Sequence, residues 1–94
     1  MHGKDELLSA ARLRLRKKKI DALDSDIRQL IEAAVTDLER IGVKEEHLDC
    51  SDPLIREAVL TFVNANYGSN PDSEKLMRAY DMFLTKIKGG KYCV

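Results

Sequence analysis

The amino-acid sequence predicts an all-α fold, a single small domain of about four helices. Apolar residues recur at three- and four-residue steps through four segments, and helix-starting and helix-ending residues bracket most of them. No segment is a strong candidate for a strand. Since 94 residues suffice for one domain around one core, we expect a single domain over 1–94 with a flexible N-terminus at 1–4 and a tail at 89–94.

The first predicted helix covers about Asp5 to Leu15. Its apolar residues at helical spacing are Leu7, Leu8, Ala11 and Leu15. The overlapping run Leu13-Arg14-Leu15-Arg16 also alternates as a strand would, so the sequence does not fix the residue at which this helix ends. The basic run at 16–19 repels itself, which is typical of a solvated bend or a helix end.

The second predicted helix has the clearest pattern. Its continuous apolar stripe consists of Ile27, Leu30, Ile31, Ala34, Val35, Leu38 and Ile41. Asp24 or Ser25 can cap its start, and Gly42 stops it. Asp24 and Asp26 also place negative charge at the first turn, where the exposed backbone amides favour it.

A polar, acidic loop from Gly42 to Ser51 leads to the third predicted helix. Asp52-Pro53 is typical of a cap followed by the first helical residue, because proline has no amide hydrogen to lose there. The apolar residues of this helix are Leu54, Ile55, Ala58, Val59, Leu60, Phe62 and Val63. Their arc is broad, so we expect this helix, which ends at Asn66-Tyr67-Gly68, to be the central one. Gly68 suits the left-handed position that ends a helix, and Tyr67 can pack its ring and leave its hydroxyl in water.

The fourth predicted helix repeats the cap-then-proline start at Asn70-Pro71 and ends at Gly89-Gly90. Its apolar stripe consists of Leu76, Met77, Tyr80, Phe83, Leu84 and Ile87. Lys86 and Lys88 complement the helix dipole near its end. Nothing in the sequence fixes the tail that follows.

Charge is sorted along the chain although the formal net charge is zero. Residues 1–20 carry seven cations against two carboxylates, a balance of +5, while 21–57 carry eleven carboxylates against four cations, a balance of −7. A basic and an acidic zone can meet head to tail between neighbouring copies, and a closed set of such contacts forms a ring. We expect such assembly to weaken as salt rises. The alternative is that both zones only keep a monomer soluble.

The sequence offers little for catalysis or for a bound cofactor. His47 and Cys50 could touch a metal, but zinc needs about four ligands and the other histidine is His2. The loop carboxylates lack the spacing of a calcium loop, and phosphate-loop and nucleophile motifs are absent. We therefore expect no enzyme activity, no cofactor and no metal, and reduced thiols at Cys50 and Cys93.

Binding to DNA or to a membrane was weighed from the same residues. Six cations between Arg12 and Lys19 could give salt-dependent, sequence-blind DNA affinity, or could form only a solvated charge run. A helix-turn-helix is excluded by the long link from Ile41 to Pro53 and by the single cation, Arg56, of the third helix. No apolar run approaches the roughly 18 residues of a membrane span, and no secretory signal opens the chain, so we expect a cytoplasmic protein.

Several motifs together resemble the head-tail connector (adaptor) family of long-tailed bacteriophages, whose members are often described as DNA-packaging proteins. The resemblance covers about residues 7–88. The motifs are Asp21-Ala22-Leu23-Asp24 with Ile27, Leu30 and Ile31; Asp52-Pro53-Leu54-Ile55 with Ala58 and Val59; the run from Phe62 to Gly68; and Glu74-Lys75 with Tyr80-Asp81. Their order and spacing carry the resemblance, especially the Asp-Pro-Leu-Ile start and the Asn-Tyr-Gly stop of one helix.

The resemblance implies a structural subunit of the virion, at the head-tail interface, that is assembled in the host cytoplasm. Such subunits form a ring, dodecameric by resemblance, beneath the portal protein; the ring extends the DNA channel and carries the stopper and tail proteins. The family implies no catalytic residues and no sequence-specific DNA binding. The alternative function is a small DNA-associated or regulatory helical module.

We expect the subunit or portal interface to include the basic run and parts of its surroundings. The expected interface residues are Arg12, Arg14, Arg16, Lys17, Lys18, Lys19, Asp21, Asp24, Lys91 and Tyr92. Replacement of Lys17, Lys18 and Lys19 by glutamate should therefore impair assembly.

Overall fold

The structure is a computed structural model that describes residues 2–17, 23–48, 52–67, 70–90 and 92. Four α-helices and one short 3-10 helix follow one another: α1 (His2–Lys17), α2 (Asp24–Arg40), η1 (Glu45–His47), α3 (Pro53–Asn66) and α4 (Ser73–Lys88). The described part of the chain contains no strand. The predicted all-α fold of about four helices is confirmed.

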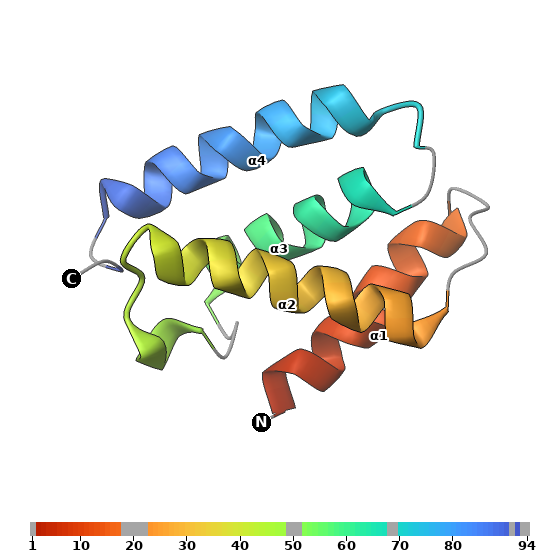
Figure 1. Cartoon of the computed structure of the whole chain (residues 1–94), viewed down its shortest axis with the longest axis horizontal. Helices are drawn as coiled ribbons and strands as arrows, with labels where there is room; N and C mark the ends of the chain where they lie inside the picture. The colour runs from red at the N-terminus through yellow and green to blue at the C-terminus, as the bar shows by residue number, and fades with distance from the viewer. Residues whose placement is uncertain (1, 18–22, 49–51, 68–69, 91, 93–94) are drawn as a thin grey trace.

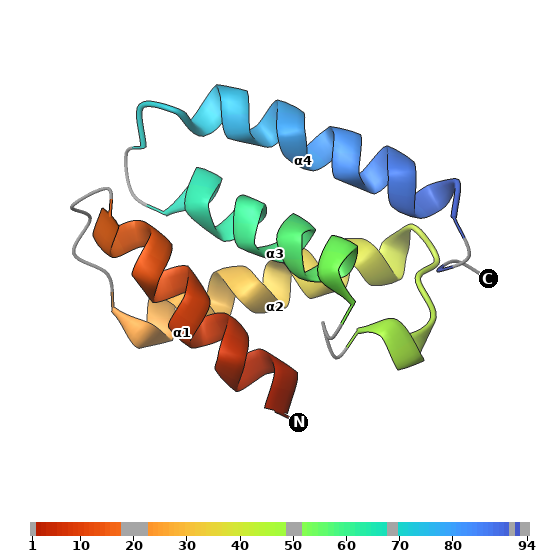
Figure 2. The same cartoon turned by 180° about the vertical axis from the view of Figure 1, so that it is seen from behind.

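Helix α3 lies at the centre of the molecule, as its broad apolar arc predicts. It packs against α4 on one side and against α1 and α2 on the other (Figure 1). The reverse view in Figure 2 shows α1 crossing α2 on the side of α3 that faces away from α4. Each of the other three α-helices described here therefore packs against α3.

The hydrophobic core draws on all four α-helices. Its buried members are Leu7, Ala11, Leu15, Ile27, Ile31, Ala34, Val35, Leu38, Val43, Ile55, Ala58, Val59, Leu60, Val63, Tyr80 and Ile87. Helix α3 also buries the polar Thr61 and Asn64, which are 5% and 8% exposed. A helix that hides residues around most of its circumference is surrounded by other elements, which agrees with its central place.

Helix α1 is longer than predicted, because it begins at His2 and continues to Lys17. Residues 2–4 belong to this helix, since no proline interrupts the polar residues that precede Leu7. The flexibility expected at 1–4 stays a prediction. Leu13 is 52% exposed while Leu7 and Leu15 are fully buried. This burial pattern follows the helical period and rules out the strand-like alternation.

The predicted caps are confirmed at two helix ends. The Asp52 carboxylate accepts a hydrogen bond from the Leu54 backbone N–H at 2.9 Å, and Pro53 is the first residue of α3. Gly42 has a φ of 96°, the left-handed conformation that follows a helix end. Gly68, the predicted stop of α3, lies outside the described residues.

The cap predicted for α2 is wrong. Helix α2 has Leu23 as its N-cap, without a side-chain cap, because the carboxylate of Asp24 binds Arg12 instead. Helix α4 begins at Ser73, later than Asn70-Pro71 predicts, but Asn70 Oδ1 accepts the Asp72 N–H at 2.8 Å, as a capping side chain does. Asn70 is 6% exposed and donates through Nδ2 to the Asn64 carbonyl oxygen at 2.7 Å, so it secures the turn that precedes the helix.

The apolar stripe of α4 is only partly buried. Tyr80 and Ile87 are enclosed, whereas Met77, Phe83 and Leu84 are half-buried against the core. Helix α4 lies on one flank of the molecule and packs mainly on α3, so the edges of its stripe stay accessible (Figure 1).

Candidate functional site

The basic run expected at an interface is partly engaged within the subunit. Arg12 Nε donates to Asp24 Oδ1 at 3.0 Å, which ties α1 to the first turn of α2. Both side chains stay close to half-exposed, at 45% and 44%. Two residues expected to contact a neighbouring subunit or the portal, one from each charged zone, thus neutralise each other inside one chain.

Arg14 is held even more closely. Its guanidinium donates two hydrogen bonds to the Glu57 carboxylate of α3, both at 2.8 Å, in the two-pronged geometry that arginine favours with carboxylates. The hydrogen bonds from Arg14 hold the pKa of Glu57 below its ordinary value, against the opposing effect of partial burial. Arg56 adds a longer contact to Glu6, 3.6 Å between Nη1 and Oε2. Helix α1 therefore docks through ion pairs as well as through its apolar face.

Of the other residues predicted at the interface, Arg16 and Lys17 belong to α1 and four lie outside the described residues. Arg16 is exposed on the last turns of α1. Lys17 is the final residue of that helix. Lys18, Lys19, Asp21 and Lys91 lie outside the described residues.

Tyr92 is fixed by contacts that the sequence did not predict. Its backbone carbonyl accepts from Lys44 N–H at 2.8 Å, and its hydroxyl donates to the Asp52 carboxylate at 3.1 Å. His47 meets its ring edge-on, with 5.2 Å between the ring centroids. Nothing in the sequence fixes the tail, and these contacts of Tyr92 arise from its approach to Lys44, His47 and Asp52, which lie far from it in the sequence.

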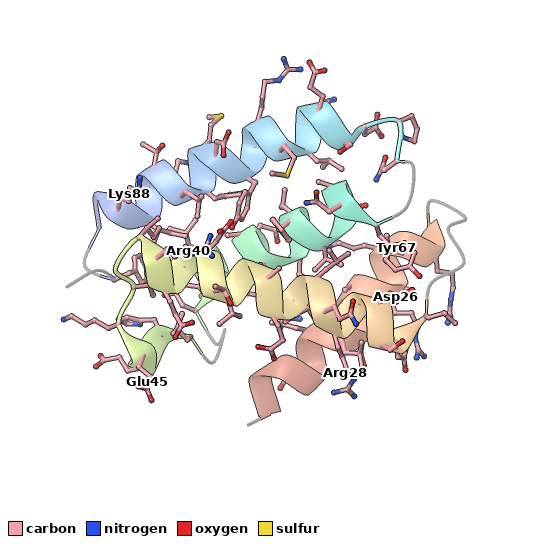
Figure 3. All side chains as sticks on the ribbon, in the orientation of Figure 1. Asp26, Arg28, Arg40, Glu45, Tyr67 and Lys88 are labelled. Carbon is pink, nitrogen blue, oxygen red and sulfur yellow. The ribbon has the colours of Figure 1, made fainter. Side chains whose placement is uncertain are left out.

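An open groove separates the start of α2 from the end of α3. Its lining residues are Asp26, Gln29, Leu30, Asn66 and Tyr67. The Tyr67 hydroxyl accepts from Leu23 N–H at 2.8 Å and approaches Asp26 Oδ2 at 3.5 Å. This hydroxyl joins α3 to α2, and both of its contacts are exposed, so it binds the protein while remaining open to water. Figure 3 shows Asp26 and Tyr67 side by side at one end of the molecule.

Opposite ends of the molecule carry different charged groups. Arg28 lies near Asp26 and Tyr67, whereas Arg40, Glu45 and Lys88 lie at the far end (Figure 3). All of these charged residues are exposed. The sequence reveals each charge but not its end of the molecule, since residues 26 and 67 come together only through the packing of α2 on α3.

Within the described ranges, no three histidine, cysteine or acidic side chains gather as a metal-binding group. His47 is described but Cys50 is not, so the weighed His47–Cys50 pair lies partly outside them. Within the same ranges, no helix combines the length and the apolar character needed to cross a membrane.

Comparison with known proteins adds no neighbour. No protein-family model, no curated protein and no solved structure matches this chain.

Proposed function

We propose that this chain is a structural subunit of the head-tail connector of a long-tailed bacteriophage. Copies of it form a ring beneath the portal protein, and the ring extends the DNA channel and provides the docking platform for the stopper and tail proteins. The observation that carries the proposal is the order and spacing of the motifs along residues 7–88. Its most specific part, the segment between Asp52-Pro53 and Asn66, coincides with the central helix α3.

The charge distribution supports a conduit for DNA better than a DNA-binding module. A channel through which DNA slides must not hold phosphates by releasing their counterions. The subunit has no formal net charge, and Arg12 and Arg14 of its basic run are already paired with Asp24 and Glu57. Fewer cations therefore remain for phosphate than the sequence alone implies.

Electron microscopy of the protein mixed with its portal protein tests the proposal. The portal is taken from the gene cluster that encodes this chain. The expected result is a ring of this subunit on the portal. Failure of the protein to join the portal or any virion particle contradicts the proposal.

A gel-shift assay at moderate salt, with native mass measurement over a concentration series, tests the alternative. A monomer or dimer that shifts DNA under these conditions favours the DNA-associated module. Assembly with the portal without tight DNA binding favours the connector.

A further inference from the structure

The groove between α2 and α3 has the chemistry of a receptor for a basic side chain. Leu30 and Tyr67 are half-buried and provide an apolar floor, while the more exposed Asp26, Gln29 and Asn66 contribute carboxylate or amide oxygens. No lysine or arginine is among these lining residues. A guanidinium could bind the carboxylate, stack on the tyrosine ring and lay its aliphatic stem on the leucine.

The end of α3 adds to this preference. Its last turn contains no basic residue, so the negative end of the helix dipole lacks the usual compensation there. Asn66 Nδ2 donates to the Phe62 carbonyl oxygen at 2.8 Å, which leaves its amide oxygen as an acceptor. The nearby Arg12 is occupied by Asp24. A cation in the groove would thus be attracted both by the Asp26 carboxylate and by the negative end of the α3 dipole.

Exposed cations of suitable length lie at the opposite end of the same chain. Arg40 ends α2, its side chain is 76% exposed, and its guanidinium lies 3.9 Å from the Asp37 carboxylate, a weak surface contact. Lys88 ends α4 and is also exposed. Because Arg40 follows Asp26 by 14 residues on α2, roughly 21 Å of helix separates these two residues. Arg40 therefore reaches such a groove only on another molecule.

The two ends also match in the order of their charges. In Figure 3, Arg40 lies above Glu45 at one end, and Asp26 and Tyr67 lie above Arg28 at the other. A second copy placed end to end with the first brings Arg40 toward Asp26 and Tyr67, and Glu45 toward Arg28. Both pairs are oppositely charged, so the register is favoured by charge complementarity.

We infer that Arg40 of one copy of this chain binds in the groove of Asp26 and Tyr67 on a second copy, in a head-to-tail contact. The inference rests on the proposed function, for which it names the surfaces between subunits. The contact uses two different faces, so each copy keeps one free face of each kind for a further copy. The assembly closes into a ring when each copy is rotated by a fixed angle relative to the last.

Charge reversal in the full-length protein tests this contact. The Asp26→Arg and Arg40→Asp variants are each analysed by sedimentation velocity at about 50 mM and about 500 mM salt, up to about 1 mM protein. The expected result is that the native chain self-associates at low salt, and that each reversal weakens this association at least about tenfold.

A mixture of the two variants tests whether the two reversed charges restore the contact between subunits. The reversed groove of the Asp26→Arg subunit fits the reversed end of the Arg40→Asp subunit, and the remaining native surfaces fit each other. An equimolar mixture should therefore associate although neither variant does so alone. Circular dichroism of each variant verifies that α2 is intact.

Arg78→Asp is the matched control, because Arg78 is 72% exposed on α4 and forms only a long contact to Glu74, 3.7 Å. This change should leave self-association unchanged. A native chain that stays monomeric at every concentration, a mixture that fails to associate, or a control that weakens association equally overturns the inference. If the protein nevertheless joins the portal, the proposed function stands and only the contact is wrong.

Discussion

The hydroxyl of Tyr67 shows how a single polar atom can fix the relation of two helices. It accepts the backbone N–H of Leu23, the N-cap residue of α2, whose own side chain has no oxygen to offer. The donor and acceptor are 44 residues apart in sequence. Such a link depends on how α2 and α3 pack, and periodicity alone could not reveal it.

Replacing Tyr67 by phenylalanine should lower the free energy of unfolding by about 1 kcal/mol, because the ring stays and one hydrogen bond is lost. The Leu23 amide lies in an exposed segment and can bind water, which keeps the loss small. Urea unfolding followed by circular dichroism measures the change. A variant as stable as the native chain would show that the hydroxyl contributes nothing to this junction.

The Arg14–Glu57 pair makes a pH-dependent contribution to stability. The pKa of Glu57 is lowered in the folded chain, chiefly by the hydrogen bonds from Arg14, so the pair stabilises the fold above the ordinary value of 4.5. The contribution is lost as the pH falls through the lowered folded pKa. Both side chains are more than a third exposed, which limits the contribution to about 1 kcal/mol or less.

We therefore expect Glu57→Gln to be less stable than the native chain at pH 7, by about 0.5 to 1 kcal/mol. The difference should shrink as the pH falls through the lowered pKa of Glu57, where the native carboxylate takes up a proton. Denaturant unfolding at pH 7 and at a series of acidic pH values measures the difference. A gap that stays constant with pH would assign the effect to packing and not to charge.

At the scale of elements, the sequence predicts what depends on neighbours along the chain. Helical periodicity identified all four α-helices, and Asp52-Pro53 located the start of α3 correctly. The cap of α2 is misplaced because a contact with another helix decides it: the Asp24 carboxylate binds Arg12 of α1. Helix α4 begins at Ser73, while Asn70 both accepts the Asp72 N–H and donates to the Asn64 carbonyl oxygen of α3.

Asp52 combines two tasks, since its carboxylate caps α3 and also accepts the Tyr92 hydroxyl. Asp52→Ala should cost about 1 to 2 kcal/mol in unfolding free energy, the usual range for loss of an N-cap. Asp52→Asn should cost less, because an amide oxygen can still accept from the Leu54 N–H. Thermal and urea unfolding of the two variants give the comparison.

Asp81→Ala on the exposed face of α4 serves as the control for this series and should change stability by no more than about 0.5 kcal/mol. Equal losses at Asp52 and Asp81 would contradict the capping role of Asp52.

For the whole molecule, the sequence predicts a basic and an acidic segment, but it does not predict that the two segments form ion pairs with each other in the folded chain. The +5 and −7 segments meet within one subunit through Arg12–Asp24 and Arg14–Glu57. The Arg12 and Arg14 side chains are therefore less available to other molecules than their places in the sequence predict. Linear charge counts could not predict this, because the crossing of α1 over α2 and α3 brings the two segments together.

Replacing Lys17, Lys18 and Lys19 by glutamate separates two kinds of contact. If the basic run meets the portal, the triple variant should be incorporated less into portal assemblies while its self-association is retained. Pull-down with the portal protein and sedimentation of the isolated variant measure the two properties. Normal incorporation of the variant would count against the basic run as an interface.

The central burial of α3 has a consequence for the order in which the chain opens. Amide protons of α3 can exchange with solvent only when at least one of its flanking helices has moved away, whereas α1 and α4 each have one face in water. Deuterium uptake should therefore be slowest in the middle of α3, around Val59 and Val63, and faster in the outer helices. The slowest exchange, in α3, then reports the global unfolding of the chain, whereas α1 and α4 can also exchange through separate local unfolding.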